Sequence, residues 1–150
     1  MAGAAPTAPL AETIPLWRWG SAWPRLADWQ GLGFSGSFLG AFRDPPDAGQ
    51  AQRVRAALDQ AQALGHAMGL YLHPLLSARW GAAGQADAAD AAVQAHAMAT
   101  LDAWMQAVGD HPALAHMLLN SEYAARWQRP AAALTAAMAR AARARRPDLL

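Results

Sequence analysis

The sequence predicts an α/β domain with parallel strands, built from four β-α units that form the amino-terminal half of a TIM-type (β/α)8 barrel over residues 13–150. Short apolar runs alternate along the chain with longer segments of helical periodicity. Each run is apolar at successive positions, as strands buried between helices require. A complete barrel needs about 250 residues. The 150 residues therefore predict half of one, whose expected partner is a carboxyl-terminal half-barrel or a second copy.

The first two strands and the helix between them are predicted from apolar runs and from the prolines and glycines that bound them. Residues 1–12 are rich in Ala and Pro and lack the basic segment of a signal peptide, so they predict a flexible leader. An apolar run predicts a strand over 14–19. A proline near the start and glycines at the exit predict a short helix over 24–32. The second strand is expected at 34–39.

The rest of the chain continues the alternation. Val54 and Leu58 mark the apolar face of the next helix, which a glycine ends. A Gly-rich loop at 77–85 precedes the longest helix. The elements predicted in this part are helices at 48–64, 87–108 and 130–145 and strands at 68–73 and 113–120.

Two architectures fit this order of elements, an open doubly wound sheet and part of a (β/α)8 barrel. No strand-to-helix turn carries the glycine pattern that cradles a phosphate, because Gly31-Leu32-Gly33 precedes a strand. Polar and aromatic residues instead gather where the predicted strands end, which is where barrels keep their sites. This distribution favours the barrel.

Composition narrows the function classes. Twelve basic and 11 acidic residues give a formal charge of +1, which predicts neither a nucleic-acid nor a membrane-surface partner. The chain has no Cys, so disulfides and thiolate sites are excluded. Because no metal-binding histidine motif occurs either, no metal or other cofactor is predicted. No run of 18 apolar residues predicts a transmembrane helix, and the sequence indicates no cellular location.

The most informative segment is an apolar run, preceded by His111-Pro112, that ends in Asn120-Ser121-Glu122. It resembles the fourth strand of the clan-A glycoside hydrolases, which are (β/α)8 barrels. The resemblance implies that Glu122 is the general acid/base and that Asn120 binds a sugar hydroxyl. It also implies a nucleophile on a seventh strand, so residues 1–150 alone are expected to be inactive.

The chemistry of glycoside cleavage suits this assignment. One carboxyl must protonate the leaving oxygen while a second attacks or activates water. Only Glu12, in the leader, and Glu122 are glutamates, so Glu122 is the one placed for catalysis. The alternative for Glu122 is a structural role, capping a loop or pairing with Arg126.

Other residues near strand ends are candidates for binding a carbohydrate substrate. Arg43, Asp44 and His73 are expected to contact hydroxyls, although Asp44 also suits a helix cap and His73 a packed position. Indole faces suit the C–H faces of pyranose rings. The aromatic candidates are Trp17, Trp19, Trp80, Tyr123 and Trp127, whereas Trp104 lies on an apolar helical stripe and predicts core.

Two other function classes remain open from the sequence. One is a non-catalytic carbohydrate-binding or scaffold half-barrel, which would use the same aromatic residues without a proton donor. The other is a barrel enzyme acting on phosphorylated sugars. An aldolase-type Schiff base would need a lysine, and the chain has none.

Overall fold

The structure is a computed structural model, and it describes residues 17–18, 36–80, 86–120 and 129–149. Strands β2 (Gly36–Phe42), β3 (Ala67–Leu72) and β4 (Leu114–Leu119) form a parallel sheet. The two-residue strand β1 (Trp17–Arg18) joins it beside β2, so the order is β1-β2-β3-β4. The prediction of an α/β domain with parallel strands is therefore confirmed.

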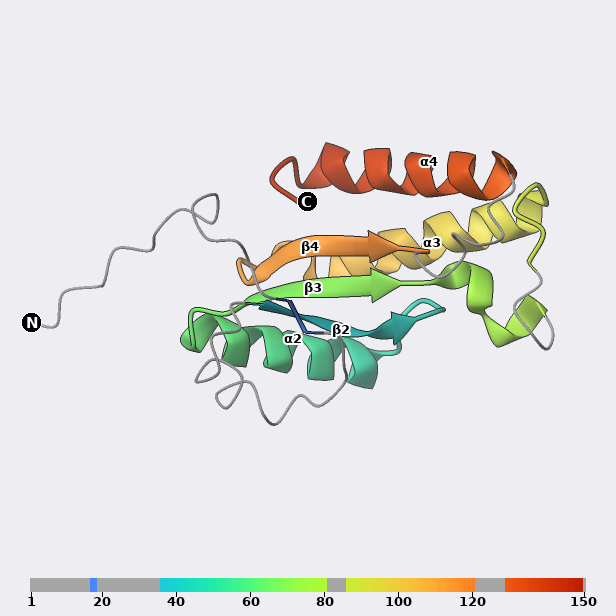
Figure 1. Ribbon diagram of the computed structural model, residues 1–150. Coiled ribbons are helices and arrows are strands. Elements are labelled where there is room, and N and C mark those ends of the chain that lie inside the picture. The colour runs from blue at the N-terminus through green and yellow to red at the C-terminus, as the bar shows by residue number, and fades with distance from the viewer. Residues whose placement is uncertain (1–16, 19–35, 81–85, 121–128, 150) are drawn as a thin grey trace, which may run out of the picture.

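Three helices cover the sheet among the described residues: α2 (Ala48–Ala63), α3 (Ala91–Val108) and α4 (Arg129–Arg145). Each strand pairs with the next strand in the sequence, so the chain always moves in the same direction across the sheet. Because the connections between parallel strands are right-handed, their helices lie on one face of the sheet. Helix α3 contacts both α2 and α4 and lies between them (Figure 1). Four complete β-α units are not seen, because β1 has only two residues and the helix predicted at 24–32 lies outside the described residues.

Several predicted boundaries need correction. Strand β2 was expected to end at Leu39 but continues to Phe42. Gly40 adopts a φ of 31°, and the pairing with β3 shifts register between Leu39 and Ala41 and then continues. Helix α3 starts at Ala91, since Asp90 accepts a hydrogen bond from the N–H of Ala92 and caps it.

Two short 3-10 helices, Pro74–Leu76 and Ala78–Trp80, follow β3, and the second occupies the start of the loop predicted at 77–85. The N–H of Ser77 donates to the carbonyl of Pro74, which closes the first of these turns. Residues 81–85, like the leader at 1–12, lie outside the described part of the chain.

The core lies between the sheet and the helices. Strand residues at alternate positions supply one side of it, and residues on the apolar stripes of the helices supply the other. Fully or almost fully buried members include Leu39, Leu70, Leu72, Val54, Leu58, Leu101, Trp104 and Met138. Trp104 therefore lies in the core, as its helical stripe predicts.

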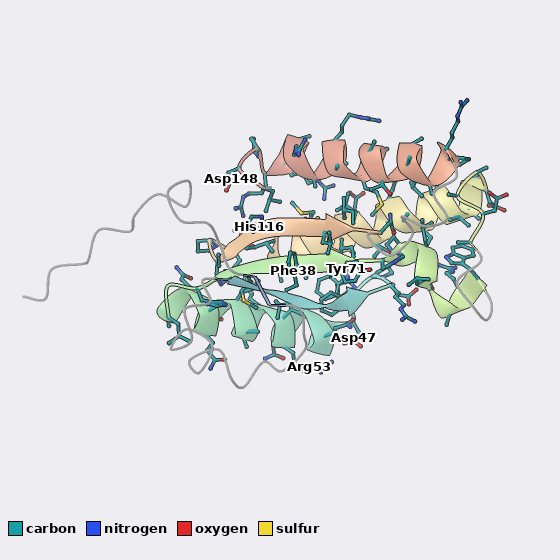
Figure 2. The ribbon with its side chains drawn as sticks, in the orientation of Figure 1. Phe38, Asp47, Arg53, Tyr71, His116 and Asp148 are labelled. Carbon is teal, nitrogen blue, oxygen red and sulfur yellow. The ribbon has the colours of Figure 1, made fainter. Side chains whose placement is uncertain are left out.

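Gly69 allows the Phe38 ring to lie close to the backbone of β3, on the face of the sheet opposite the core. Gly69 pairs with Phe38 of β2, and a Cβ added to Gly69 would overlap the Phe38 ring. Tyr71, two residues farther along β3, occupies the same face; Phe38 and Tyr71 are labelled in Figure 2. The glycine in this strand is explained by a neighbouring ring that fills the place of a side chain.

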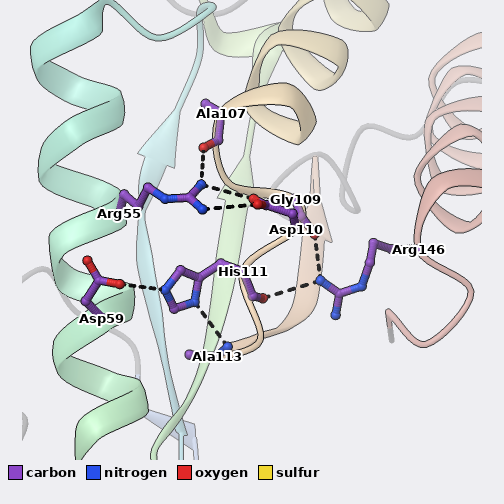
Figure 3. A network of polar contacts seen from close by, with 8 residues as sticks. All are labelled: Arg55, Asp59, Ala107, Gly109, Asp110, His111, Ala113 and Arg146. Carbon is purple, nitrogen blue, oxygen red and sulfur yellow. Dashed lines mark hydrogen bonds and ion pairs between the residues drawn. The ribbon is translucent and has the colours of Figure 1, made fainter.

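At the amino-terminal edge of the sheet, a polar network joins α2, the α3–β4 connection and the segment after α4 (Figure 3). Arg55 pairs with Asp110 at 3.0 Å, and His111 Nε2 lies 3.0 Å from Asp59 Oδ1. The guanidinium of Arg146 donates to the carbonyls of Gly109, His111 and Leu114. These contacts join α2 and the segment after α4 to the connection that leads from α3 into β4.

Candidate functional site

The carboxyl ends of the three longer strands deliver four of the predicted site residues to one edge of the sheet. Arg43 and Asp44 follow β2, His73 follows β3 and Asn120 follows β4. The N–H of His73 donates to the Phe42 carbonyl at 2.7 Å, and the N–H of Asn120 donates to the Leu72 carbonyl at 3.0 Å. The sheet hydrogen bonding thus continues one step past the strands and aligns these residues.

His73 is fully buried. Burial lowers the pKa of His73 to about 4; a backbone hydrogen bond opposes this shift, and the positive charge of Arg43 adds to it. The imidazole is therefore neutral at pH 7, with one nitrogen able to donate and the other able to accept a hydrogen bond.

Asn120 is buried and adopts a φ of 51°, a conformation that Asn tolerates better than most residues. Its Nδ2 donates to Thr135 Oγ1 at 3.1 Å and lies 3.7 Å from Met138 Sδ, so α4 holds its amide. Its Oδ1 accepts no hydrogen bond from the described residues. The amide of Asn120 is thus fixed in a buried position by its contacts with α4.

Asp44 is the centre of a polar cluster that the sequence did not predict. Its Oδ1 accepts a 2.6 Å hydrogen bond from Ser77 Oγ and lies 3.3 Å from His96 Nε2. His96 Nε2 is also 3.1 Å from the Arg43 carbonyl, and Trp104 Nε1 donates to the Asp44 carbonyl at 3.1 Å. Two side chains of α3 and one from the segment after β3 thus fix the turn that follows β2.

The contact with Arg79 determines which nitrogen of the His96 ring carries the hydrogen. An Arg79 guanidinium nitrogen lies 2.6 Å from His96 Nδ1. A guanidinium only donates, so Nδ1 must accept, and the ring hydrogen of the neutral tautomer is assigned to Nε2, facing Asp44 and the Arg43 carbonyl. The Arg79 backbone N–H approaches Ser77 Oγ at 3.4 Å. Asp44, Ser77, Arg79 and His96, hereafter the Asp44 cluster, are therefore connected by contacts with one another.

Trp80 is less available to a sugar than the sequence suggests. Its indole N–H donates to the Pro74 carbonyl at 3.2 Å and is therefore already used within the protein. Arg79 lies 5.0 Å from the centre of the indole ring, and His96 meets the ring edge-on at 5.5 Å. A sugar would have to use what remains of the indole surface.

Several predicted site residues lie outside the described part of the chain: Glu122, Trp19, Tyr123 and Trp127. For Trp17, only the backbone pairing with Gly36 is described. Conversely, Ser77, Arg79 and His96 were missed. The one available signal for His96 was its place on the apolar stripe of α3, between Val93 and Ala97, where a polar side chain needs a partner.

Among the described residues no group of three His, Cys, Asp or Glu side chains could hold a metal ion. No helix in the same part of the chain is long and apolar enough to cross a membrane. Comparison with known protein families, curated proteins and solved structures gives no match for this chain.

Proposed function

We propose that the chain is the amino-terminal half of a (β/α)8 barrel and that the carboxyl edge of its sheet takes part in hydrolysis of glycosidic bonds. The strand order supports the fold. Four parallel strands paired in sequence order, with helices on one face, are what consecutive units of a barrel contain. An open doubly wound sheet instead reverses its strand order near the middle.

The position of Asn120 carries the functional proposal. β4 ends at Leu119, and the buried Asn120 that follows it donates its backbone N–H to the Leu72 carbonyl, next to His73. The sequence continues directly into Ser121-Glu122. A proton donor of a barrel glycosidase belongs at the carboxyl end of a strand, where substrate lies across the barrel mouth. The resemblance of this segment to clan-A glycoside hydrolases assigns that role to Glu122.

The described residues suit the binding of a neutral, hydroxyl-rich substrate. Arg43, which is exposed, supplies hydrogen-bond donors, and Asp44, whose side chain is 55% exposed, supplies an acceptor. Glu122 would protonate the leaving oxygen. The second carboxyl required by the reaction is the one that the resemblance assigns to a seventh strand.

The test is turnover of aryl glycosides and oligosaccharides by the protein expressed from its whole reading frame. Glu122→Gln keeps the side-chain shape but removes the proton, and we expect it to lower kcat about 100-fold or more while leaving substrate binding in place. Glu12→Gln, the same change at the other glutamate, is the matched control and should leave kcat unchanged. Equal turnover in both variants would contradict the proposal, and saccharide binding without turnover in the wild type would favour a binding module.

A further inference from the structure

The Asp44 cluster presents an exposed carboxylate on a buried support. The side chain of Asp44 is 55% exposed, whereas that of His96 is only 5% exposed, and Ser77 is buried. Ser77 Oγ donates to Oδ1, His96 Nε2 lies 3.3 Å from the same oxygen, and no hydrogen bond or ion pair to Oδ2 is found among the described residues. One carboxylate oxygen is therefore fixed, while the other remains available on the exposed side chain.

This arrangement is poorly explained by stability alone. An exposed carboxylate contributes little to folding through its ion pairs, yet a buried hydroxyl donates to it and a buried imidazole lies beside it. The backbone of the same turn is fixed as well, because His96 and Trp104 bind the carbonyls of Arg43 and Asp44. Supporting contacts of this kind are what preorganised binding groups require.

We propose that Asp44 Oδ2 accepts a hydrogen bond from a hydroxyl of the saccharide, and that Ser77 and His96 are positioning residues that set its direction. The ligand class follows from the charges at the edge. Arg43 and Asp44 are adjacent and of opposite sign, and His73 is neutral, so the edge offers no net charge to an anion but both donors and acceptors to a diol. The inference takes its ligand class from the proposed function.

The experiment measures saccharide binding by the protein expressed from its whole reading frame with calorimetry, using cellotriose, xylotriose and mannotriose as probes. Asp44→Asn retains an oxygen that can accept from Ser77 but presents an amide where Oδ2 stood. We expect the dissociation constant of the bound probe to rise about tenfold or more, which corresponds to about 1.4 kcal/mol. Asp47→Asn is the matched control in the same turn, since Asn also caps helices well, and should change affinity less than twofold.

The role of the positioning residues is tested by a double-mutant cycle. His96→Gln should weaken binding severalfold in the wild-type background and cause a clearly smaller loss in the Asp44→Asn background, because part of its effect is exerted through the Asp44 side chain. Ser77→Ala should weaken binding in the same way and Ser77→Thr, which keeps the hydroxyl, should restore it. A purely structural His96 would lower the melting temperature and leave the affinity unchanged.

The possible failures are distinguishable. If probes bind and Asp44→Asn binds them as tightly as the wild type does, the inference is overturned and the hydrolytic proposal, which rests on Glu122, stands. If Asp44→Asn weakens binding but Glu122→Gln retains full turnover, the hydrolytic role of Glu122 is overturned and the Asp44 site stands. Absence of binding by all three probes to the wild type would overturn the Asp44 assignment.

Discussion

Arg146 offers the sharpest test of what holds the described fold together. Its guanidinium lies just after α4 and donates to the carbonyls of Gly109 and His111 in the α3–β4 connection (Figure 3). It also donates to the Leu114 carbonyl and pairs with Asp148. The side chain is only 18% exposed. We consider Arg146→Met, which keeps a long apolar stem but removes every donor.

The expected loss can be worked from these contacts. The distances to the Gly109, His111 and Leu114 carbonyls are 2.6, 3.3 and 3.1 Å, so two are well formed and one is long. A hydrogen bond to a charged group contributes about 1.5–3 kcal/mol, and water can replace part of it at a site that is not fully buried. We expect the free energy of unfolding to fall by about 2–4 kcal/mol.

The assay is urea denaturation of Arg146→Met beside Arg143→Met, which makes the same change at an exposed position of α4. Surface substitutions away from special contacts usually change stability by about 0.5 kcal/mol or less, which is our expectation for Arg143→Met. If both variants lost the same amount, the carbonyl contacts of Arg146 would not stabilise the fold and the reasoning would be wrong.

Three further predictions concern pH and the sheet. The pKa of His73 is lowered to about 4 in the folded state, so wild-type stability should fall as pH drops from about 6.5 towards 4, with a loss of about 2 kcal/mol at pH 5. Urea titrations of His73→Gln over the same pH range should not show this loss. Gly69→Ala should lower stability by about 1–3 kcal/mol because the methyl would overlap Phe38; an unchanged urea midpoint would refute the close approach. Hydrogen bonds from Arg146 lower the pKa of Asp148 to about 2, so stability present above about pH 4 is lost as pH falls towards 2, and Asp148→Asn should lose less in an acid titration followed by circular dichroism.

Most of the secondary structure was predictable because its causes are local. Apolar runs predicted β3 and β4 to within one residue at each end, and Asp47 and Asp90 cap the helices that follow them. β2 was predicted too short because sequence alone does not show that a glycine will open an irregularity and let the strand continue to Phe42. The start of α3 was placed too early because Asp87 and Asp90 are both capping residues, and only backbone geometry selects Asp90.

The candidate site was predictable only in its location. The rule that parallel strands end at one edge predicted that Arg43, His73 and Asn120 would lie there. It did not predict their surroundings: the amide of Asn120 is held by Thr135 on α4, and Trp80 gives its N–H to a backbone carbonyl. The positions of Glu122 and the aromatic residues around it stay predictions.

By itself, the sequence determined the α/β class, the alternation of strands and helices and the strand ends that carry polar residues, because each depends on spacing and composition within a few residues. Only the tertiary structure decided that Ser77 and His96 meet at Asp44, 33 and 52 positions away in the chain. The reason is geometric: partners for a carboxylate are chosen by helix packing and by the direction of each side chain, which no local pattern records.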